Sequence, residues 1–179
     1  MRRLLFVTLL LSACTASEED ARSAAAEHRV DKVPVAKPRA DRILERGGPG
    51  RIVYLGTTSV PARAKRGQSV QLTHYFQVDT PPKGDAQVFV HAEIAGGSER
   101  VLVADHQPVQ GKLPIHLWRK GEIWADAHRV YIPEDLPAAS VDFLIGLYVG
   151  QERWTTEAAA GGSDGRSRLR ALRFPIDGP

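Results

Sequence analysis

Cysteine is almost absent from this chain of 179 residues, which contains one, Cys14. A lone cysteine excludes a disulfide framework and the zinc and iron–sulfur sites that need several cysteines. The sequence also has no HExxH pattern of the zinc hydrolases, and its glycine-rich stretches lack the lysine of a phosphate-binding loop. Neither of these enzyme classes is therefore indicated by a motif.

An excess of charge is lacking as well, because 24 Lys and Arg stand against 21 Asp and Glu. Two of the basic residues, Arg2 and Arg3, lie in a segment that we expect to be removed, which leaves 22 against 21. A nearly neutral protein lacks the basic surface with which nucleic acids are bound. The composition therefore predicts no nucleic-acid partner.

Long apolar runs are missing except near the start, where residues 4–11 are apolar apart from Thr8. As a helix this run spans about 12 Å, far less than the roughly 30 Å of a bilayer's hydrocarbon core. Arg2 and Arg3 precede it and the small residues Ser12 and Ala13 follow it, which is the order of a secretory signal. We therefore expect residues 1–13 to be an export signal and not a membrane span.

The residues Leu11-Ser12-Ala13-Cys14 that follow this run resemble the lipobox of bacterial lipoproteins. The resemblance implies cleavage before Cys14, a diacylglyceryl group on its thiol and an acylated new N-terminus. Two or three acyl chains hold a protein on a membrane permanently. Thr15 stands where enterobacterial lipoproteins of the inner membrane carry Asp, which implies the outer membrane and a periplasm-facing domain, with surface exposure left open. The alternative is an ordinary secretory signal.

Residues 15–50 differ in composition from the rest of the chain, with seven acidic and seven basic residues and no aromatic residue. Such a segment buries too little apolar surface to offset the entropy lost on ordering. We therefore expect the lipidated Cys14 and the chain up to residue 50 to form a flexible tether. The alternative is a helix in this segment that packs on the body of the protein.

From residue 51 onward, apolar and polar residues alternate, which is typical of half-buried strands. Clusters rich in Gly and Pro separate the alternating runs. About eight short strands without a convincing helix predict one all-β domain over 51–179, a β-sandwich of immunoglobulin-like or jelly-roll-like type. The predicted strands are 51–58, 70–78, 87–94, 99–106, 122–132, 141–149, 152–156 and 168–176.

The strand over 87–94 carries the candidate binding face. Its even-numbered residues are apolar and make a complete core face, while Phe89, His91 and Glu93 lie opposite. An aromatic ring among polar neighbours on an outer face favours binding of a sugar or of a partner loop. The alternative is that the protein's own loop 107–121 covers Phe89. The candidate binding residues are Phe89, His91, Glu93, Asp105, His106 and Trp118.

Other roles for these residues and their neighbours stay open. His91, Glu93, Asp105 and His106 would form a metal site or a carboxylate-dependent hydrolase if they met in one cleft. We expect neither metal nor cofactor, because none of the histidines has a metal-motif spacing. The tryptophans form either a sugar platform or part of the core. Two further expectations are a hydrogen-bonded core position for His74 and a bulge or close approach at Gly146.

Several short motifs occur in a characteristic order between residues 70 and 155. They are Phe89-Val90-His91, an Asp-x-x-Pro at 105–108, a Trp-x-x-Gly-Glu at 118–122, then Asp126, Ile132-Pro133 and Gly146-Leu147-Tyr148. This order resembles the extracytoplasmic β-sandwich domains that accompany membrane-bound glycosyltransferases using lipid-linked sugars. The 179 residues hold no membrane-spanning glycosyltransferase part. The resemblance therefore implies the fold and contact with glycan, not the activity.

These observations predict a lipid-anchored envelope protein that binds a glycan or a partner protein through its β-sandwich. One alternative is an envelope hydrolase that depends on a metal or on carboxylates. The other is a purely structural component of an envelope complex.

Overall fold

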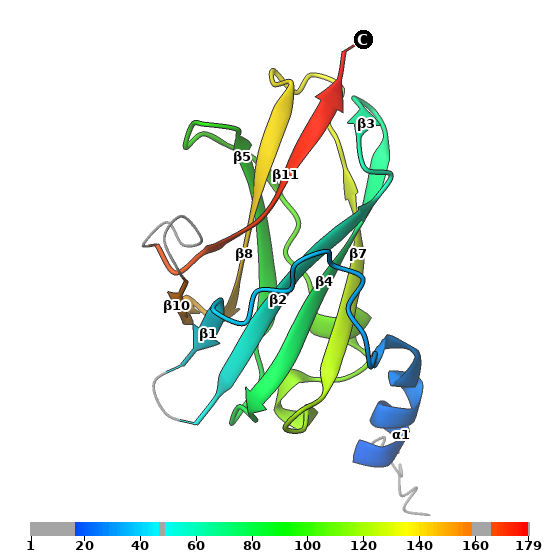
Figure 1. The fold of residues 1–179 in the computed structure, drawn as a ribbon, viewed down its shortest axis with the longest axis vertical. Coiled ribbons are helices and arrows are strands. Elements are labelled where there is room, and N and C mark those ends of the chain that lie inside the picture. The colour runs from blue at the N-terminus through cyan, green and yellow to red at the C-terminus, as the bar shows by residue number, and fades with distance from the viewer. Residues whose placement is uncertain (1–16, 47–48, 159–165, 179) are drawn as a thin grey trace, which may run out of the picture.

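Two β-sheets face each other in the computed structural model, which describes residues 17–46, 49–158 and 166–178 (Figure 1). One sheet has the strand order β10-β1-β2-β4-β7, and the other has the order β3-β11-β8-β5-β6, with β9 paired to β8. The predicted all-β sandwich is confirmed. The strands are β1 (Ile43–Glu45), β2 (Arg51–Val60), β3 (Ala64–Lys65), β4 (Ser69–Thr80), β5 (Gln87–Ile94), β6 (Arg100–Val103), β7 (Ile123–Tyr131), β8 (Ser140–Val149), β9 (Glu152–Arg153), β10 (Thr155–Glu157) and β11 (Leu169–Asp177).

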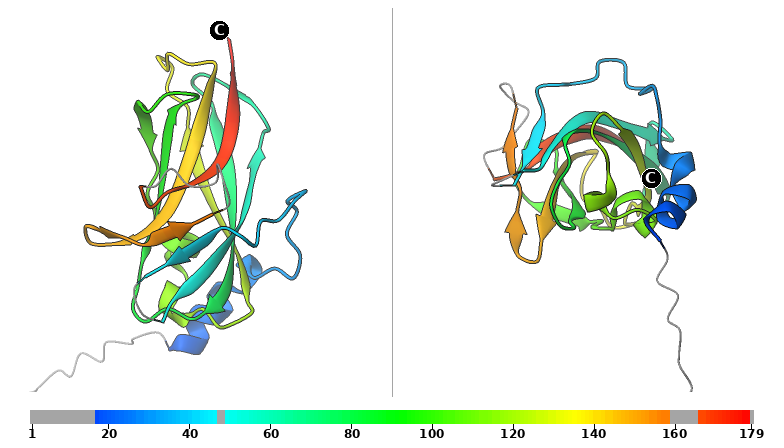
Figure 2. Two further views of the ribbon diagram at one scale, coloured as in Figure 1. Left: turned by 60° about the vertical axis from the view of Figure 1, so that its left-hand side comes forward. Right: turned by 90° about the horizontal axis from the view of Figure 1, so that it is seen from below.

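The helices are short and lie at one end of the sandwich (Figure 2). None of the described helices is long and apolar enough to cross a membrane. The predicted export signal and the predicted lipobox with Cys14 lie outside the described residues. The helices are α1 (Glu18–Ala24) and the 3₁₀ turns η1 (Ala26–His28), η2 (Pro108–Gly111) and η3 (Ile115–Leu117).

Every predicted strand has a counterpart, and β5 has the predicted bounds. The range 152–156 is divided, because β9 pairs with β8 whereas β10 pairs with β1 in the other sheet. The residue between them, Trp154, is buried and donates its backbone N–H to the Leu147 carbonyl at 2.9 Å. The chain therefore crosses from one sheet to the other at a buried tryptophan.

The core between the sheets holds all three tryptophans, each about 1% exposed. The Trp118 ring packs on Trp124 with 5.8 Å between centroids, and its Nε1 donates to the Leu113 carbonyl at 3.3 Å. The core alternative for the tryptophans is therefore correct. The candidate binding role of Trp118 is wrong, since a fully packed ring presents no surface to a ligand.

The expected tether needs a correction for residues 17–46 and 49–50, which pack against the sandwich. Ser17 caps α1 by accepting a hydrogen bond from the Asp20 backbone N–H at 3.1 Å. Arg22 then donates to the Leu117 carbonyl at 2.6 Å and forms an ion pair with Glu122. Strand β1 pairs between β10 and β2, and its Leu44 is fully buried. A few apolar side chains and arginine contacts thus order a mostly polar segment, and the domain extends N-terminal of residue 51.

Candidate functional site

Phe89 is not the open platform that its strand position predicts, because its side chain is 1% exposed. The Arg153 guanidinium lies over its ring, 4.5 Å from the centroid. Phe89 stands opposite Gly146 in the register of β5 and β8. A Cβ at Gly146 would lie 2.4 Å from the Phe89 Cζ, so the expected close approach at this glycine is made by Phe89 and not by a tryptophan. The rings of His91 and Tyr148 and the Arg153 guanidinium, and no group of loop 107–121, are the aromatic and cationic neighbours of this ring among the described residues.

Glu93 and His91, the polar residues on the same face of β5, also have partners within the protein. Glu93 forms a buried ion pair with Arg168 at 2.7 Å. His91 Nε2 lies 3.5 Å from Asp105 Oδ1, and Asp105 also accepts the Val90 backbone N–H at 3.2 Å. Burial lowers the pKa of His91, although the Asp105 charge opposes that effect. Glu93 therefore has a structural partner, and His91 is a neutral, buried ring.

His106 follows Asp105 in the chain but contacts the other sheet. Its Nε2 lies 2.8 Å from the Asp126 Oδ2 and its Nδ1 lies 3.0 Å from the Ala104 carbonyl. Burial is the largest single influence and disfavours the charged ring, but the hydrogen bonds to Asp126 and Ala104 and the charges of Asp126 and Asp105 together outweigh it, so the pKa of His106 is raised. Both ring nitrogens then carry hydrogen and donate. His91, Glu93, Asp105 and His106 thus fall into separate groups and do not share one cleft.

His128 stacks on His106, and His74 stacks on the other side of His128; we call His74, His128 and His106 the histidine stack. The ring centroids of His106 and His128 are 4.0 Å apart, and those of His128 and His74 are 5.1 Å apart. Burial, followed by the charge of His106, lowers the pKa of His128 to about 4. Burial also lowers the pKa of His74 well below its usual value. The stack therefore has the neutral His128 ring between the charged His106 ring and the neutral His74 ring.

His74 is the hydrogen-bonded core histidine that its position in the strand predicts. It is fully buried, and its Nδ1 lies 2.6 Å from the Thr57 Oγ1 and 3.2 Å from the Tyr54 hydroxyl. His128 is different, because neither of its ring nitrogens has a hydrogen-bond partner in the part of the chain that the structure describes. Buried nitrogens without partners cost stability, which makes His128 an unusual choice for a purely structural position.

Backbone strain lies next to the histidine stack, in η2. Val109 and Gln110 have φ angles of 53° and 58°, and Gly111 follows at 75°. The left-handed region is rare for non-glycine residues and a true outlier for β-branched valine. The Val109 N–H donates to Asp126 Oδ1 at 2.8 Å, and Asp126 is fully buried. One carboxylate thus holds both the His106 ring and the strained segment in place.

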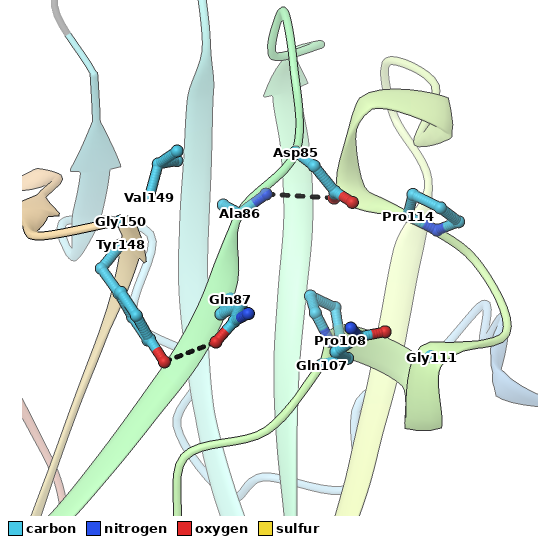
Figure 3. Close-up of a pocket in the computed structure, with 10 residues that line it drawn as sticks. All are labelled: Asp85, Ala86, Gln87, Gln107, Pro108, Gly111, Pro114, Tyr148, Val149 and Gly150. Atoms are coloured by element: carbon cyan, nitrogen blue, oxygen red, sulfur yellow. Dashed lines mark hydrogen bonds between the residues drawn. The ribbon is translucent and has the colours of Figure 1, made fainter.

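A pocket of about 150 Å³ lies on one side of this segment, at the end of the sandwich (Figure 3). The 107–114 segment with Pro108 and Pro114 faces Gln87 and Tyr148 across it. The Tyr148 hydroxyl donates to the Gln87 Oε1. Asp85 Oδ1 accepts the backbone N–H groups of Ala86 and Ile115, so this carboxylate organises the rim.

An open groove of about 760 Å³ lies on the other side of the segment, beside β7. Gln107 and Gly111 line both hollows, so the two form one surface, which we call the glutamine groove. Its four glutamines each offer a donor and an acceptor. The groove-forming side chains are those of Gln71, Gln87, Gln107, Gln110, His106, His128, Arg129 and Tyr148.

The residue types and spacing in the sequence did not reveal this groove. His106 was the one predicted site residue that lines it. His128 and Asp126 come from β7 and meet His74 of β4 through the register of the two strands. Their partner His106 comes from the other half of the sandwich, so the association depends on tertiary structure.

Among residues 17–46, 49–158 and 166–178, no group of three or more His, Cys, Asp or Glu side chains has the proximity needed to hold a metal ion. No protein-family model matches the chain, and no curated protein matches it either.

Proposed function

We propose that this protein is a lipid-anchored module of the bacterial cell envelope that binds a glycan in the glutamine groove. The strained segment at Val109 and Gln110, held by Asp126 between two amide-lined hollows, is the observation that carries the proposal. Left-handed non-glycine residues cost about 1–3 kcal/mol each and occur where the surroundings enforce them, often at ligand sites. Here Gln110 lines the open groove, and the adjacent Gln107 lines both hollows.

The chemistry of the groove matches a hydroxyl-rich chain. Amide side chains donate and accept at once, as sugar hydroxyls do. Pro108, Pro114 and Tyr148 add apolar surface against which sugar C–H groups pack. Because the pocket and the groove share Gln107 and Gly111, a ligand that contacts both hollows would be an extended one.

The groove is fixed before a ligand arrives, which favours binding. The buried Asp126 carboxylate accepts two hydrogen bonds. One is charge-assisted and comes from the His106 ring, and the other comes from the Val109 backbone N–H. A site held by such partners loses less conformational entropy on binding. The histidine stack therefore serves as the support of the strained segment, and His128 also lines the groove.

Because residues 17–46 pack against the sandwich, a lipid on Cys14 would hold the groove at a short distance from the membrane. Acylation of Cys14 would leave three peptide steps before Ser17, about 10 Å when extended. Helix α1 lies at the same end of the sandwich as η2 and η3 (Figures 1 and 2). Glu27, just beyond α1, pairs with Lys112, the neighbour of Gly111. We therefore propose that the outer-membrane anchor holds the groove close to the bilayer, on the periplasmic side.

A partner protein is the second candidate, and the outer edge of β7 favours it. The N-terminal segment meets this edge at Trp124, where Arg29 forms an isolated bridge. Tyr131, at the far end of the strand, is 52% exposed. The Tyr131 end of the edge lies away from this bridge, and an exposed aromatic residue there suits the addition of a partner's strand.

Co-sedimentation of the full-length protein in detergent with purified peptidoglycan sacculi tests the proposal. Each lost amide hydrogen bond weakens binding by about 0.5–1.5 kcal/mol, so the double variant Gln107→Ala/Gln110→Ala should bind about tenfold or more weakly. Gln77→Ala, outside the groove, is the matched control. Equal binding by the double variant and the wild type would refute the groove as the glycan site. Tyr131→Ala should lose binding only if the β7 edge is the site.

The anchor is tested separately by mass spectrometry of the purified protein. We expect a mature N-terminus at Cys14 with diacylglyceryl and acyl groups. An intact Met1 or an unmodified Cys14 thiol would refute the lipid anchor and leave the groove untouched.

A further inference from the structure

A third hollow, of about 750 Å³, lies on the outer face of the β3-β11-β8-β5-β6 sheet. Phe89, His91 and Asp105 form part of its lining, so three of the predicted binding residues do meet at one surface. It adjoins the glutamine groove, since Tyr148 and Gly150 line both this hollow and the enclosed pocket. Its chemistry is different, because arginines take the place of most of the amides.

We propose that this hollow is a carboxylate-binding site for an acidic sugar, with Arg100 and Arg153 as the groups that hold the carboxylate. This inference rests on the proposed function in one respect, namely that the carboxylate belongs to a sugar. The site itself is separate from the glutamine groove.

The charges that line the hollow leave one net positive charge. Arg100 and Arg153 contribute two cations, and Asp105 contributes one anion. Glu93, on the same face of β5, is neutralised by its ion pair with Arg168. Burial, together with the nearby arginines, keeps the pKa of His91 low, so its ring adds no charge. A net charge of one matches a monoanion.

The two guanidinium groups have donors to spare. The Arg153 Cζ lies over the Phe89 ring, and one of the arginine's N–H groups donates to the Arg166 carbonyl at 3.3 Å. A guanidinium has five N–H donors, so four remain. The Arg100 side chain, exposed on the edge strand β6, makes no hydrogen bond or ion pair within the described ranges. A planar guanidinium binds the two oxygens of a carboxylate in parallel.

Neutral groups beside the arginines suit the rest of a sugar ring. Gln151 and Ser167 line the hollow and offer hydrogen bonds to hydroxyl groups. The Asp105 carboxylate already accepts the Val90 N–H and faces His91. Its charge disfavours a phosphate, which carries nearly two negative charges at neutral pH, more than a singly charged carboxylate. The site therefore selects a sugar acid over a sugar phosphate.

Titration of the full-length protein in detergent with galacturonate, galactose and inorganic phosphate at low ionic strength tests the proposal. Galacturonate should bind at least about tenfold more tightly than galactose, which lacks the carboxylate, and more tightly than phosphate. Arg100→Gln should weaken galacturonate binding about tenfold, since the residue is exposed and supports no core. Arg63→Gln, an exposed arginine whose partner is Asp177, is the matched control and should change nothing.

Three results would overturn the inference: equal binding of galactose and galacturonate, tighter binding of phosphate, or no effect of Arg100→Gln. A second variant, Arg153→Lys, keeps the charge and loses the planar fork, and should also weaken binding. Gln107→Ala/Gln110→Ala should leave galacturonate binding intact. Sacculus binding that the Gln107→Ala/Gln110→Ala change leaves intact, together with galacturonate binding that Arg100→Gln weakens, would therefore reject the proposed groove and keep this site.

Discussion

Replacement of His128 by Phe should remove an acid sensitivity from the protein without removing the ring stack. Phe retains an aromatic ring between His74 and His106, whose centroids lie 5.1 Å and 4.0 Å from that of His128. It deletes two buried nitrogens that have no partner among the described residues. The variant should therefore be at least as stable as the wild type at pH 7.

The pH dependence follows from the direction of the shift. Burial, and then the His106 charge, lowers the pKa of His128 from 6.5 to about 4, so folding favours the neutral ring. The contribution of neutral His128 to the free energy of unfolding is complete above about pH 6.5. It is lost as the pH falls toward 4, a change of about 3 kcal/mol. His74 acts in the same direction. His106, whose pKa is raised, acts in the opposite one, since its contribution is complete below the unfolded value and is lost as the pH rises.

Urea unfolding at pH 7, 6, 5 and 4 measures the effect. The wild type should lose about 3 kcal/mol more than His128→Phe between pH 7 and pH 4. His116→Gln, at an exposed histidine, should follow the wild-type curve. Parallel curves for the wild type and His128→Phe would refute a buried neutral His128. Weakened sacculus binding by the folded His128→Phe variant would show that His128 is kept for the groove.

Three further changes test packing. Gly146→Ala places a Cβ about 2.4 Å from Phe89 Cζ and should cost about 1–3 kcal/mol in urea unfolding, an effect that Phe89→Leu should partly reverse. Leu44→Ala, in the segment before residue 51, should cost about 2–5 kcal/mol, and a loss under about 0.5 kcal/mol would contradict the packed N-terminal segment. Asp126→Ala removes one partner of a buried pair and should cost about 3–5 kcal/mol, whereas an unchanged unfolding midpoint would contradict its supporting role.

The sandwich was predictable because its long strands have one face in the core and one outside. In β4, Val70 and Leu72 are fully buried on one side while Ser69 and Gln71 are exposed on the other, which is the alternation that the sequence shows. The short strands β1 and β3 have three and two residues, too few for a period. They form because β1 pairs with β2 and β10, and β3 pairs with β11.

The packed N-terminal segment was missed because composition describes average behaviour. Residues 15–50 are polar, but the buried Ala25 and Leu44 and the contacts of Arg22 are enough to fix the described part. Such contacts depend on partners such as Glu122, which are distant in sequence. The residue pattern of the segment alone does not indicate such distant partners.

The candidate site was predictable in part. The sequence placed Phe89, His91 and Glu93 on one face of β5, but the cover from Arg153 and the ion pair with Arg168 come from segments more than 50 residues away. The left-handed Val109 has no sequence marker, since glycine is the residue that indicates this conformation. The glutamine groove was therefore beyond sequence reasoning.

The most direct test of the account is nuclear magnetic resonance of the full-length protein in detergent, titrated with soluble glycan strands released from sacculi. If glycan binds in the glutamine groove, the side-chain amide signals of Gln107 and Gln110 should shift with the glycan concentration, while that of Gln77 should stay in place. Shifts confined to Tyr131 and the β7 edge, or no shifts at all, would contradict glycan binding in the glutamine groove.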